Sequence, residues 1–220
     1  MKILILSALE KEISILNRLI DAECNNNHHY AKVKNTERFT AVTGVGIMNA
    51  LSNTYSLIEQ IHPDIVINIG TAGGHCLEVN DGDIVVCDEA FYHGGYIMTG
   101  SSSWSTLEDT SLVIRGDEKL TKLLDGLNIS TKIHHGSTLS GDFFTRDKEL
   151  IKILNNKYHH LCEDMETIAI YKVCKEKNIP AIAFRIISNN ELKGTLYEDN
   201  VYKVNENLQS IIVQLLNSLD

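Results

Sequence analysis

The sequence predicts an α/β fold, a three-layer sandwich in which a twisted, mixed central sheet lies between two layers of helices. Apolar runs typical of buried strands alternate with helical patterns along the chain, and this alternation is typical of a sheet covered by helices. The 220 residues are 43% hydrophobic and 22% charged. A chain of this length without linker or repeat is most simply one domain, so we expect residues 1–220 to form a single domain.

The first elements are expected to be a buried strand and a helix. Residues 2–8 form a continuous apolar run, as in a parallel strand covered on both faces. Residues 10–20 carry apolar side chains at helical spacing, with Glu12 in the first turn. A strand over residues 39–42 then enters the turn at residues 43–46, where glycines let the backbone approach a ligand before the next helix begins.

The middle of the chain contains two further apolar strands, at residues 64–69 and 82–90. The first ends in the glycine-rich stretch 70–74, which leaves no bulky side chain and is expected to bend tightly or to pass close to a ligand. Residues 94–105 are rich in glycine and serine, and we expect them to form a long exposed loop.

The second half of the chain repeats the alternation of helices and strands. We expect helices at residues 117–124, 147–154, 163–177 and 201–219, and strands at residues 134–139, 161–163 and 179–187.

The ends of the predicted strands carry the side chains that point to a function. Ligands of open α/β sheets bind at the carboxyl ends of strands. An aromatic ring and a thioether can pack on a flat base, and a carboxylate can accept hydrogen bonds from two sugar hydroxyls. These positions hold Glu12, Thr71, Gly73, Phe144, Met165, Glu166, Ser188 and Asn189. No metal-ligand cluster accompanies them, so we expect neither a metal nor another cofactor.

Composition excludes several classes of partner. The net charge of −9 argues against nucleic-acid binding, which needs a basic surface. No apolar run approaches the roughly 18 residues of a membrane span. The five cysteines are odd in number and form no C-x-x-C pair. We therefore expect a cytoplasmic protein with reduced thiols.

Taken in order, the strand-end motifs resemble those of the purine nucleoside phosphorylase/nucleosidase superfamily, and within it the methylthioadenosine/S-adenosylhomocysteine nucleosidases. The resemblance extends from residue 1 to about residue 189. It is carried by residues 8–12 (ALEKE), 44–46 (GVG), 69–74 (IGTAGG), 82–86 (GDIVV), 92–93 (YH), 140–142 (SGD), 164–166 (DME) and 187–189 (ISN).

This resemblance implies roles for the strand-end residues. Glu12 resembles the acid that holds and activates the attacking water. Glu166 resembles the acid that binds the ribose hydroxyls, with Met165 packing against the sugar. Phe144 resembles the ring that stacks on the base, and the Thr145 backbone resembles the contact at the base edge. The family also implies a homodimer and a small-molecule nucleoside as the ligand.

Thr71 resembles the small hydroxyl residue near the purine or the water. The motif that contains Ser188 departs from the family at the next position, where Asn189 replaces the aspartate that protonates the leaving base. An amide cannot act as a general acid at neutral pH. It suits a 6-oxopurine edge, or a 7-deazaguanine such as queuine, which has no N7 to protonate. An Asp-to-Asn variant of a methylthioadenosine/S-adenosylhomocysteine nucleosidase is the third reading.

A second departure follows Tyr92 and His93. The nucleosidases have acidic and aromatic residues there, which build the 5′-alkylthio pocket, whereas this chain has a glycine- and serine-rich stretch. Methylthioadenosine is therefore a poorer fit. The positions at which related phosphorylases carry phosphate-binding arginines, near residues 7–10 and 67–69, hold none.

The sequence thus predicts an N-glycosidase, a nucleoside ribohydrolase that releases a purine-like base for salvage. A methylthioadenosine/S-adenosylhomocysteine nucleosidase, a nucleoside phosphorylase and a non-catalytic nucleoside-binding protein remain as alternatives.

Overall fold

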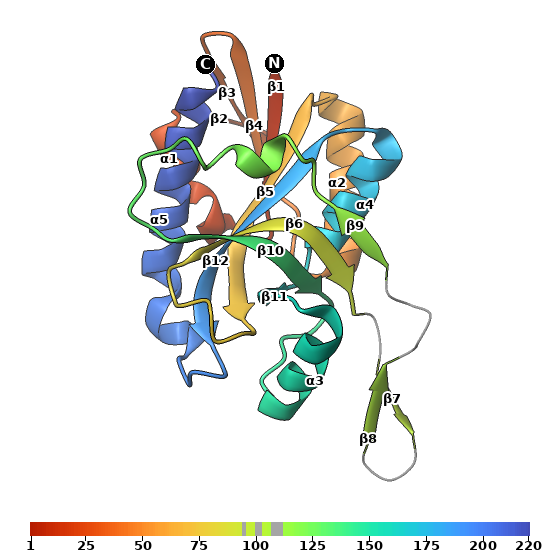
Figure 1. Cartoon of the computed structure of the whole chain (residues 1–220). Helices are drawn as coiled ribbons and strands as arrows, with labels where there is room; N and C mark the ends of the chain where they lie inside the picture. Colours follow the sequence, from red (N-terminus) through yellow and green to blue (C-terminus); the bar gives the residue numbers. More distant parts are fainter. Residues whose placement is uncertain (94–95, 100–102, 107–111) are drawn as a thin grey trace.

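The structure is a computed structural model that describes residues 1–93, 96–99, 103–106 and 112–220 (Figure 1). Ten strands in these residues form one mixed sheet. In order along the sheet they are β11 (Cys162–Asp164), β10 (Ile133–Ser140), β6 (Ile84–Tyr92), β12 (Ala181–Asn190), β5 (Ile65–Gly74), β1 (Lys2–Ser7), β4 (Thr36–Val42), β3 (His28–Val33) and β2 (Glu23–Asn25), while β9 (Val113–Arg115) pairs with β6.

One part of the sheet closes on itself. Strand β11 pairs with β10 in parallel and also with β5 in antiparallel orientation, through Glu163 opposite Gly73. Strands β5, β12, β6, β10 and β11 therefore form a closed ring, while β1, β4, β3 and β2 extend from β5 as an open sheet. The closure brings β11 beside the carboxyl ends of β5 and β12, which are parallel to each other.

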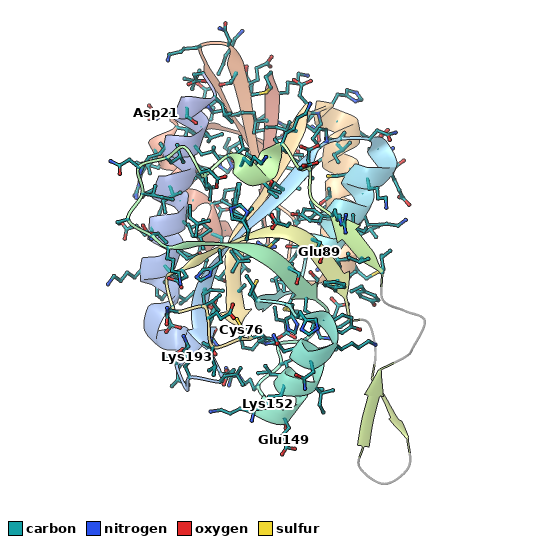
Figure 2. All side chains as sticks on the ribbon, viewed as in Figure 1. Asp21, Cys76, Glu89, Glu149, Lys152 and Lys193 are labelled. Atoms are coloured by element: carbon teal, nitrogen blue, oxygen red, sulfur yellow. The ribbon has the colours of Figure 1, made fainter. Side chains whose placement is uncertain are left out.

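Helices cover both faces of the sheet (Figure 1). Helices α1 (Ser14–Leu19) and α5 (Tyr197–Ser218) pack together on one face, and α2 (Ile47–Ile61) and α4 (Thr167–Lys177) pack together on the other. Helix α3 (Lys148–Tyr158) lies at the end of the molecule near β11, and its Glu149 and Lys152 side chains point outward (Figure 2). This arrangement confirms the predicted three-layer α/β fold.

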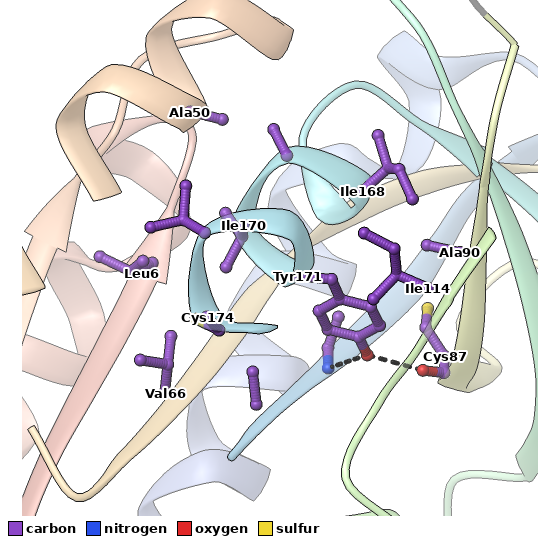
Figure 3. Close-up of a cluster of buried hydrophobic side chains, with 14 of the residues drawn as sticks. Leu6, Ala50, Val66, Cys87, Ala90, Ile114, Ile168, Ile170, Tyr171 and Cys174 are labelled. Atoms are coloured by element: carbon purple, nitrogen blue, oxygen red, sulfur yellow. Dashed lines mark hydrogen bonds between the residues drawn. The ribbon is translucent and has the colours of Figure 1, made fainter. Parts of the chain in front are cut away.

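Two apolar clusters hold the layers together, because successive side chains of a strand point to opposite faces. Ile3 and Ile5 of β1 join the cluster beneath α5, whereas Leu4 and Leu6 join the one beneath α2 and α4. Figure 3 shows the second cluster around Tyr171, whose hydroxyl donates to the Cys87 carbonyl at 2.6 Å and accepts from the Ala183 N–H at 2.8 Å. The buried phenol is thus fully hydrogen-bonded.

Some boundaries differ from the sequence-based expectations. The first expected helix is divided into a 3-10 turn, η1 (Glu10–Glu12), and α1, because Ile13 adopts φ −134° between them. The helix expected at residues 117–124 contains only the 3-10 turn η2 (Leu120–Lys122). The loop expected at residues 94–105 contains the paired strands β7 (Tyr96–Thr99) and β8 (Ser103–Thr106), while its residues 94–95 and 100–102 lie outside the described chain.

The glycine-rich stretch 70–74, for which we expected a tight bend or a close approach to a ligand, does not bend: it continues β5 as a strand to Gly74. A Cβ atom at Gly70 would lie 2.6 Å from the Arg185 guanidinium, and one at Gly74 would lie 2.8 Å from the Asn190 amide nitrogen. Neither distance is compatible with a side chain. These glycines therefore make room for side chains that pack on β5. Within the described residues, no helix is long and apolar enough to span a membrane.

Candidate active site

A cavity of about 330 Å³ opens where the carboxyl ends of β1, β5, β11 and β12 meet. Polar side chains from the segments that follow or end these strands face it, as the topology of a parallel sheet predicts. Its lining residues are Ala8, Leu9, Glu12, Val45, Thr71, Ala72, Phe144, Arg146, Glu163, Asp164, Met165, Glu166, Ser188 and Tyr197.

Glu12 enters the cavity from η1, directly after β1, and its residue is 4% exposed. One carboxylate oxygen accepts hydrogen bonds from the Thr71 N–H and hydroxyl, both at 3.0 Å, and the other accepts from the Leu9 N–H at 3.2 Å. Three protein donors therefore fix the carboxylate. About one of its four acceptor positions remains for a ligand or a water molecule.

Glu166 lies at the start of α4, on the other side of the cavity. It accepts a hydrogen bond from the Gly46 N–H at 3.0 Å, and its second oxygen lies 3.9 Å from an Arg185 nitrogen. Gly46 has φ +92°, which a glycine adopts without strain and which directs its N–H at the carboxylate. Burial raises the pKa of Glu166 to about 7; the Arg185 charge opposes this rise, and Asp164 adds to it.

Asp164 and Arg185 form a fully buried ion pair behind Glu166, with 2.9 Å between Arg185 Nε and Asp164 Oδ2. Asp164 also accepts from the Ser140 hydroxyl at 2.7 Å and from the Thr167 N–H at 3.0 Å. Burial acts to raise the pKa of Asp164, but Arg185 and the surrounding hydroxyls outweigh it and lower that pKa. Asp164 thus takes the nearest guanidinium contact and leaves Glu166 with free acceptor positions.

Phe144 forms a third side of the cavity. Its ring packs on the backbone of β5, since a Cβ atom at Gly73 would lie only 3.0 Å from the ring. The next residue, Thr145, is buried behind the ring, and both its N–H and its hydroxyl donate to Glu163 at 2.6 Å. We name Phe144 and the Gly73 backbone beneath it the base wall, because an exposed ring over bare backbone suits a flat ligand.

Asn189 lies on β12 and is fully buried directly behind the cavity. Its side-chain oxygen accepts from the Ser188 hydroxyl at 2.9 Å, and its amide nitrogen lies 3.4 Å from a Glu191 oxygen. Ser188 itself lines the cavity, and its hydroxyl oxygen also lies 3.2 Å from the Ala72 carbonyl oxygen. These contacts orient the Asn189 amide with its oxygen toward Ser188 and its nitrogen toward Glu191.

The structure brings most of the predicted residues to this one cavity. Six of them line it, and three stand immediately behind its surface. The lining residues are Glu12, Thr71, Phe144, Met165, Glu166 and Ser188, and those behind are Gly73, Thr145 and Asn189. The carboxylates of Glu12 and Glu166 thus face the same space, on which the predicted nucleoside site depends.

Sequence reasoning assigned no role in nucleoside binding to several residues that line the site. Arg146 and Glu163 adjoin predicted residues, so their neighbours were a signal. No sequence signal pointed to Tyr197, which starts α5 after an irregular segment. Its hydroxyl accepts a hydrogen bond from the Lys11 ammonium at 2.9 Å. Within the described chain, no group of three or more His, Cys, Asp or Glu side chains is arranged to hold a metal ion.

A sequence profile described as the phosphorylase superfamily matches residues 2–217, which is nearly the whole chain. This chain belongs to the phosphorylase superfamily. Two relatives are 5′-methylthioadenosine/S-adenosylhomocysteine nucleosidases. The one from Geobacillus sp. (strain WCH70) is 28% identical over 86% of this chain and 85% of its own length. The one from Geobacillus kaustophilus (strain HTA426) is 26% identical over 98% of this chain and 97% of its own length.

Solved structures place the fold of this phosphorylase-superfamily member beside two kinds of nucleoside enzyme. An Asp-to-Asn mutant of a Helicobacter pylori nucleosidase of the same kind, with 5′-methylthioadenosine in the active site, has a TM-score of 0.86 at 21% identity, covering 99% of this chain and 98% of the other. Futalosine hydrolase of Helicobacter pylori has a TM-score of 0.85 at 20% identity, and the match covers 99% of this chain and 97% of the hydrolase chain. At these identities the likeness establishes the fold.

Proposed function

We propose that this protein is a nucleoside ribohydrolase that cleaves the N-glycosidic bond of a purine-like ribonucleoside. The observation that carries the proposal is the pair of buried carboxylates, Glu12 and Glu166, which face one cavity beside the base wall. The nucleosidase names of the curated relatives support it. The ligand is a small nucleoside, and no metal enters the chemistry that we describe.

The reaction replaces one bond at the sugar. The bond from ribose C1′ to the base nitrogen breaks, and its electron pair leaves with the base, which takes up a proton from solvent. The oxygen of a water molecule bonds to C1′, and Glu12 takes a proton from that water and then returns it to solvent. Glu166 accepts hydrogen bonds from ribose hydroxyls, and Met165 packs against the sugar. Positive charge that develops on the ribose is stabilised by carboxylates in a site that excludes bulk water.

Hydrolysis suits this cavity better than phosphorolysis. The carboxylates of Glu12 and Glu166 face the cavity, and the one arginine of its lining, Arg146, has a side chain that is 64% exposed and lies 3.9 Å from Glu191. The buried Arg185 is already paired with Asp164. A phosphate dianion would therefore meet mostly like charge, which disfavours its binding.

The base is proposed to be a 6-oxopurine. The Asn189 amide stands behind Ser188 with one N–H directed at Glu191, and its second N–H is proposed to donate to an acceptor on the base; an amide cannot transfer a proton at neutral pH. A 7-deazaguanine such as queuine also fits an amide, although the names of the matched proteins give no support to a queuosine-type substrate. The second candidate is methylthioadenosine or S-adenosylhomocysteine, which the names of both curated relatives favour.

A substrate panel tests the proposal. The purified protein is incubated with adenosine, methylthioadenosine, inosine, guanosine and queuosine, with and without phosphate, and released base is measured by chromatography. We expect release of one base without phosphate, and loss of that release in Glu12→Gln. Release that requires phosphate would establish a phosphorylase, and no release from any nucleoside would support a non-catalytic binding protein.

Asn189→Asp separates the two substrate classes. If the amide recognises a 6-oxopurine, the aspartate variant loses activity on inosine or guanosine. If the amide stands where an acid is needed, the variant gains activity on methylthioadenosine. The same panel, run on both proteins, distinguishes these outcomes.

A homodimer in the cytoplasm is also proposed. The large apolar side chains of Met48 and Leu51 on α2 are 76% and 40% exposed, which supports an interface there. All five cysteines are free, which supports a reducing compartment. Light scattering on wild type and Met48→Glu tests the dimer: we expect a dimer that the charge weakens, and a monomeric wild type would contradict it.

A further inference from the structure

A buried group of polar side chains lies behind the base wall, and the reaction described above does not use it. It consists of Glu163 on β11, His75 directly after β5, His93 directly after β6, and Thr145; we name it the Glu163 cluster. The Glu163 side chain has no exposed surface, and the two imidazoles are 1% and 2% exposed. A buried carboxylate is costly unless it is well paired, so its partners matter.

Two hydrogen-bond donors and two imidazole nitrogens surround the Glu163 carboxylate. The Thr145 N–H and hydroxyl each donate to one oxygen at 2.6 Å. His93 Nε2 lies 3.0 Å from Oε1, and His75 Nε2 lies 3.4 Å from Oε2. Each carboxylate oxygen thus accepts one hydrogen bond from Thr145 and has one imidazole nitrogen beside it. Burial acts to raise the pKa of Glu163, but the histidines and Thr145 outweigh it and hold that pKa well below its usual range.

Thr145 is a buried anchor in a mostly exposed segment, whose other hydrogen bonds include those of Gly141 with Asp164 and of Asp142 with the Ile47 N–H. Residues 141–147 form no helix or strand, and from Asp142 to Asp147 every residue except Thr145 is exposed. The segment carries Phe144 at the cavity. Its neighbour Phe143 contacts the edge of the His93 ring, with 4.6 Å between ring centroids. The Glu163 cluster therefore touches the segment on both sides of Phe144.

The base wall and the Glu163 cluster also share backbone. Phe144 rests on Gly73 of β5, and Gly73 is the residue opposite Glu163 where β5 and β11 pair. A carboxylate fixed in this ladder and bonded twice to Thr145 sets where the preceding residue can lie. We propose that Glu163 is a positioning residue that holds the Phe144 ring in place to receive the base, an inference that rests on the proposed nucleosidase function.

Glu163→Gln tests this role kinetically. The amide group of glutamine would turn one acceptor of the Thr145 donors into a donor, so the segment would loosen. We expect KM for the best nucleoside of the panel to rise about tenfold to a hundredfold, as for loss of a hydrogen bond to a charged group, with kcat changed by less than about threefold. Thr145→Val loses one donor and should raise KM about fivefold, whereas Thr145→Ser keeps both donors and should raise KM less than Thr145→Val does.

A double-mutant cycle separates positioning from a purely structural role. If Glu163 acts through the ring, Glu163→Gln changes KM by less than about twofold when it is added to Phe144→Ala. Equal effects of Glu163→Gln in both backgrounds would overturn the proposal. If Glu163→Gln does not fold, Thr145→Val carries the same cycle, because it removes only one bond.

Hydrogen exchange without nucleoside provides a readout that does not depend on turnover. We expect faster amide exchange in a peptide covering residues 141–147 of Glu163→Gln, while a peptide from α2 exchanges as in wild type. Unchanged exchange in residues 141–147 would overturn the positioning role. If the wild-type protein releases no base and Glu163→Gln still shows faster exchange in residues 141–147, the proposed function is rejected and the Glu163–Thr145 anchor is established.

Discussion

Glu12 and Glu166 are both buried glutamates at the same cavity, yet their surroundings differ. Glu12 accepts three hydrogen bonds from Leu9 and Thr71. Glu166 accepts one from Gly46, and the arginine beside it makes its closest carboxylate contact with Asp164. The protein has thus fixed one carboxylate and left the other with acceptor positions to fill.

The difference assigns a task to each group. A carboxylate held by three donors keeps its position through the reaction and suits a base that acts on one water molecule. A carboxylate with free acceptor positions and a pKa of about 7 gains most when ligand hydroxyls donate to it. The same residue type therefore serves the chemical step on one side and sugar binding on the other.

Glu12→Gln is expected to have the largest effect. The amide cannot take a proton from water, so kcat should fall by about 10²–10⁴-fold while KM changes by less than about threefold. Steady-state base release measures both constants. A loss that appears mainly in KM would mean that Glu12 binds the sugar and that the contrast with Glu166 is wrong.

Glu166→Gln should change binding more than chemistry. It weakens hydrogen bonds to the ribose hydroxyls, and we expect KM to rise about tenfold to a hundredfold. A matched 2′-deoxynucleoside should lose less affinity than the ribonucleoside on this substitution. Equal losses for the two sugars would separate Glu166 from ribose recognition.

The pH profile should report Glu166 alone. Its carboxyl is protonated below about pH 7, and the ionised form accepts hydroxyl donors more strongly and at both oxygens, so kcat/KM should rise with pH through that value. Between pH 6 and pH 8 the increase should be about tenfold. Glu166→Gln should lack this inflection, and an inflection that persists there would assign it to another group.

Tyr197→Phe should have the smallest effect of these substitutions. It should change the chemical step assigned to Glu12 and not the binding assigned to Glu166. The Tyr197 hydroxyl accepts from Lys11, which lies within η1 beside Glu12. Loss of that bond should lower kcat about fivefold and leave KM unchanged. A change in KM without one in kcat would show that Tyr197 contacts the ligand directly.

The sequence predicted the layers of the fold and the cavity well, because apolar runs and strand ends are local patterns. Glu12, Phe144 and Glu166, which it predicted as site residues, line one cavity. It did not predict that β5 continues to Gly74, because glycines that make room for Arg185 look the same in sequence as glycines in a turn.

Contacts between segments that lie far apart in the sequence could not be predicted from local patterns either. The Glu163 carboxylate resembles, in the local sequence, one more acid at a helix start, and its partners Thr145, His75 and His93 come from three separate segments. Tyr197 reaches the cavity through the position of α5, which no local pattern encodes. The roles of the individual site residues remain predictions that the variants above test.

Strand β5 has a consequence for how this site can change. Over four residues its backbone supports the Arg185 guanidinium, the Glu12 carboxylate and the Phe144 ring, at Gly70, Thr71 and Gly73 respectively. A shift of β5 by one residue would misplace all three together, because alternate residues would exchange faces. New specificity is therefore expected to arise in the segments around β5, at positions such as Arg146 and Tyr197, while the strand keeps its register.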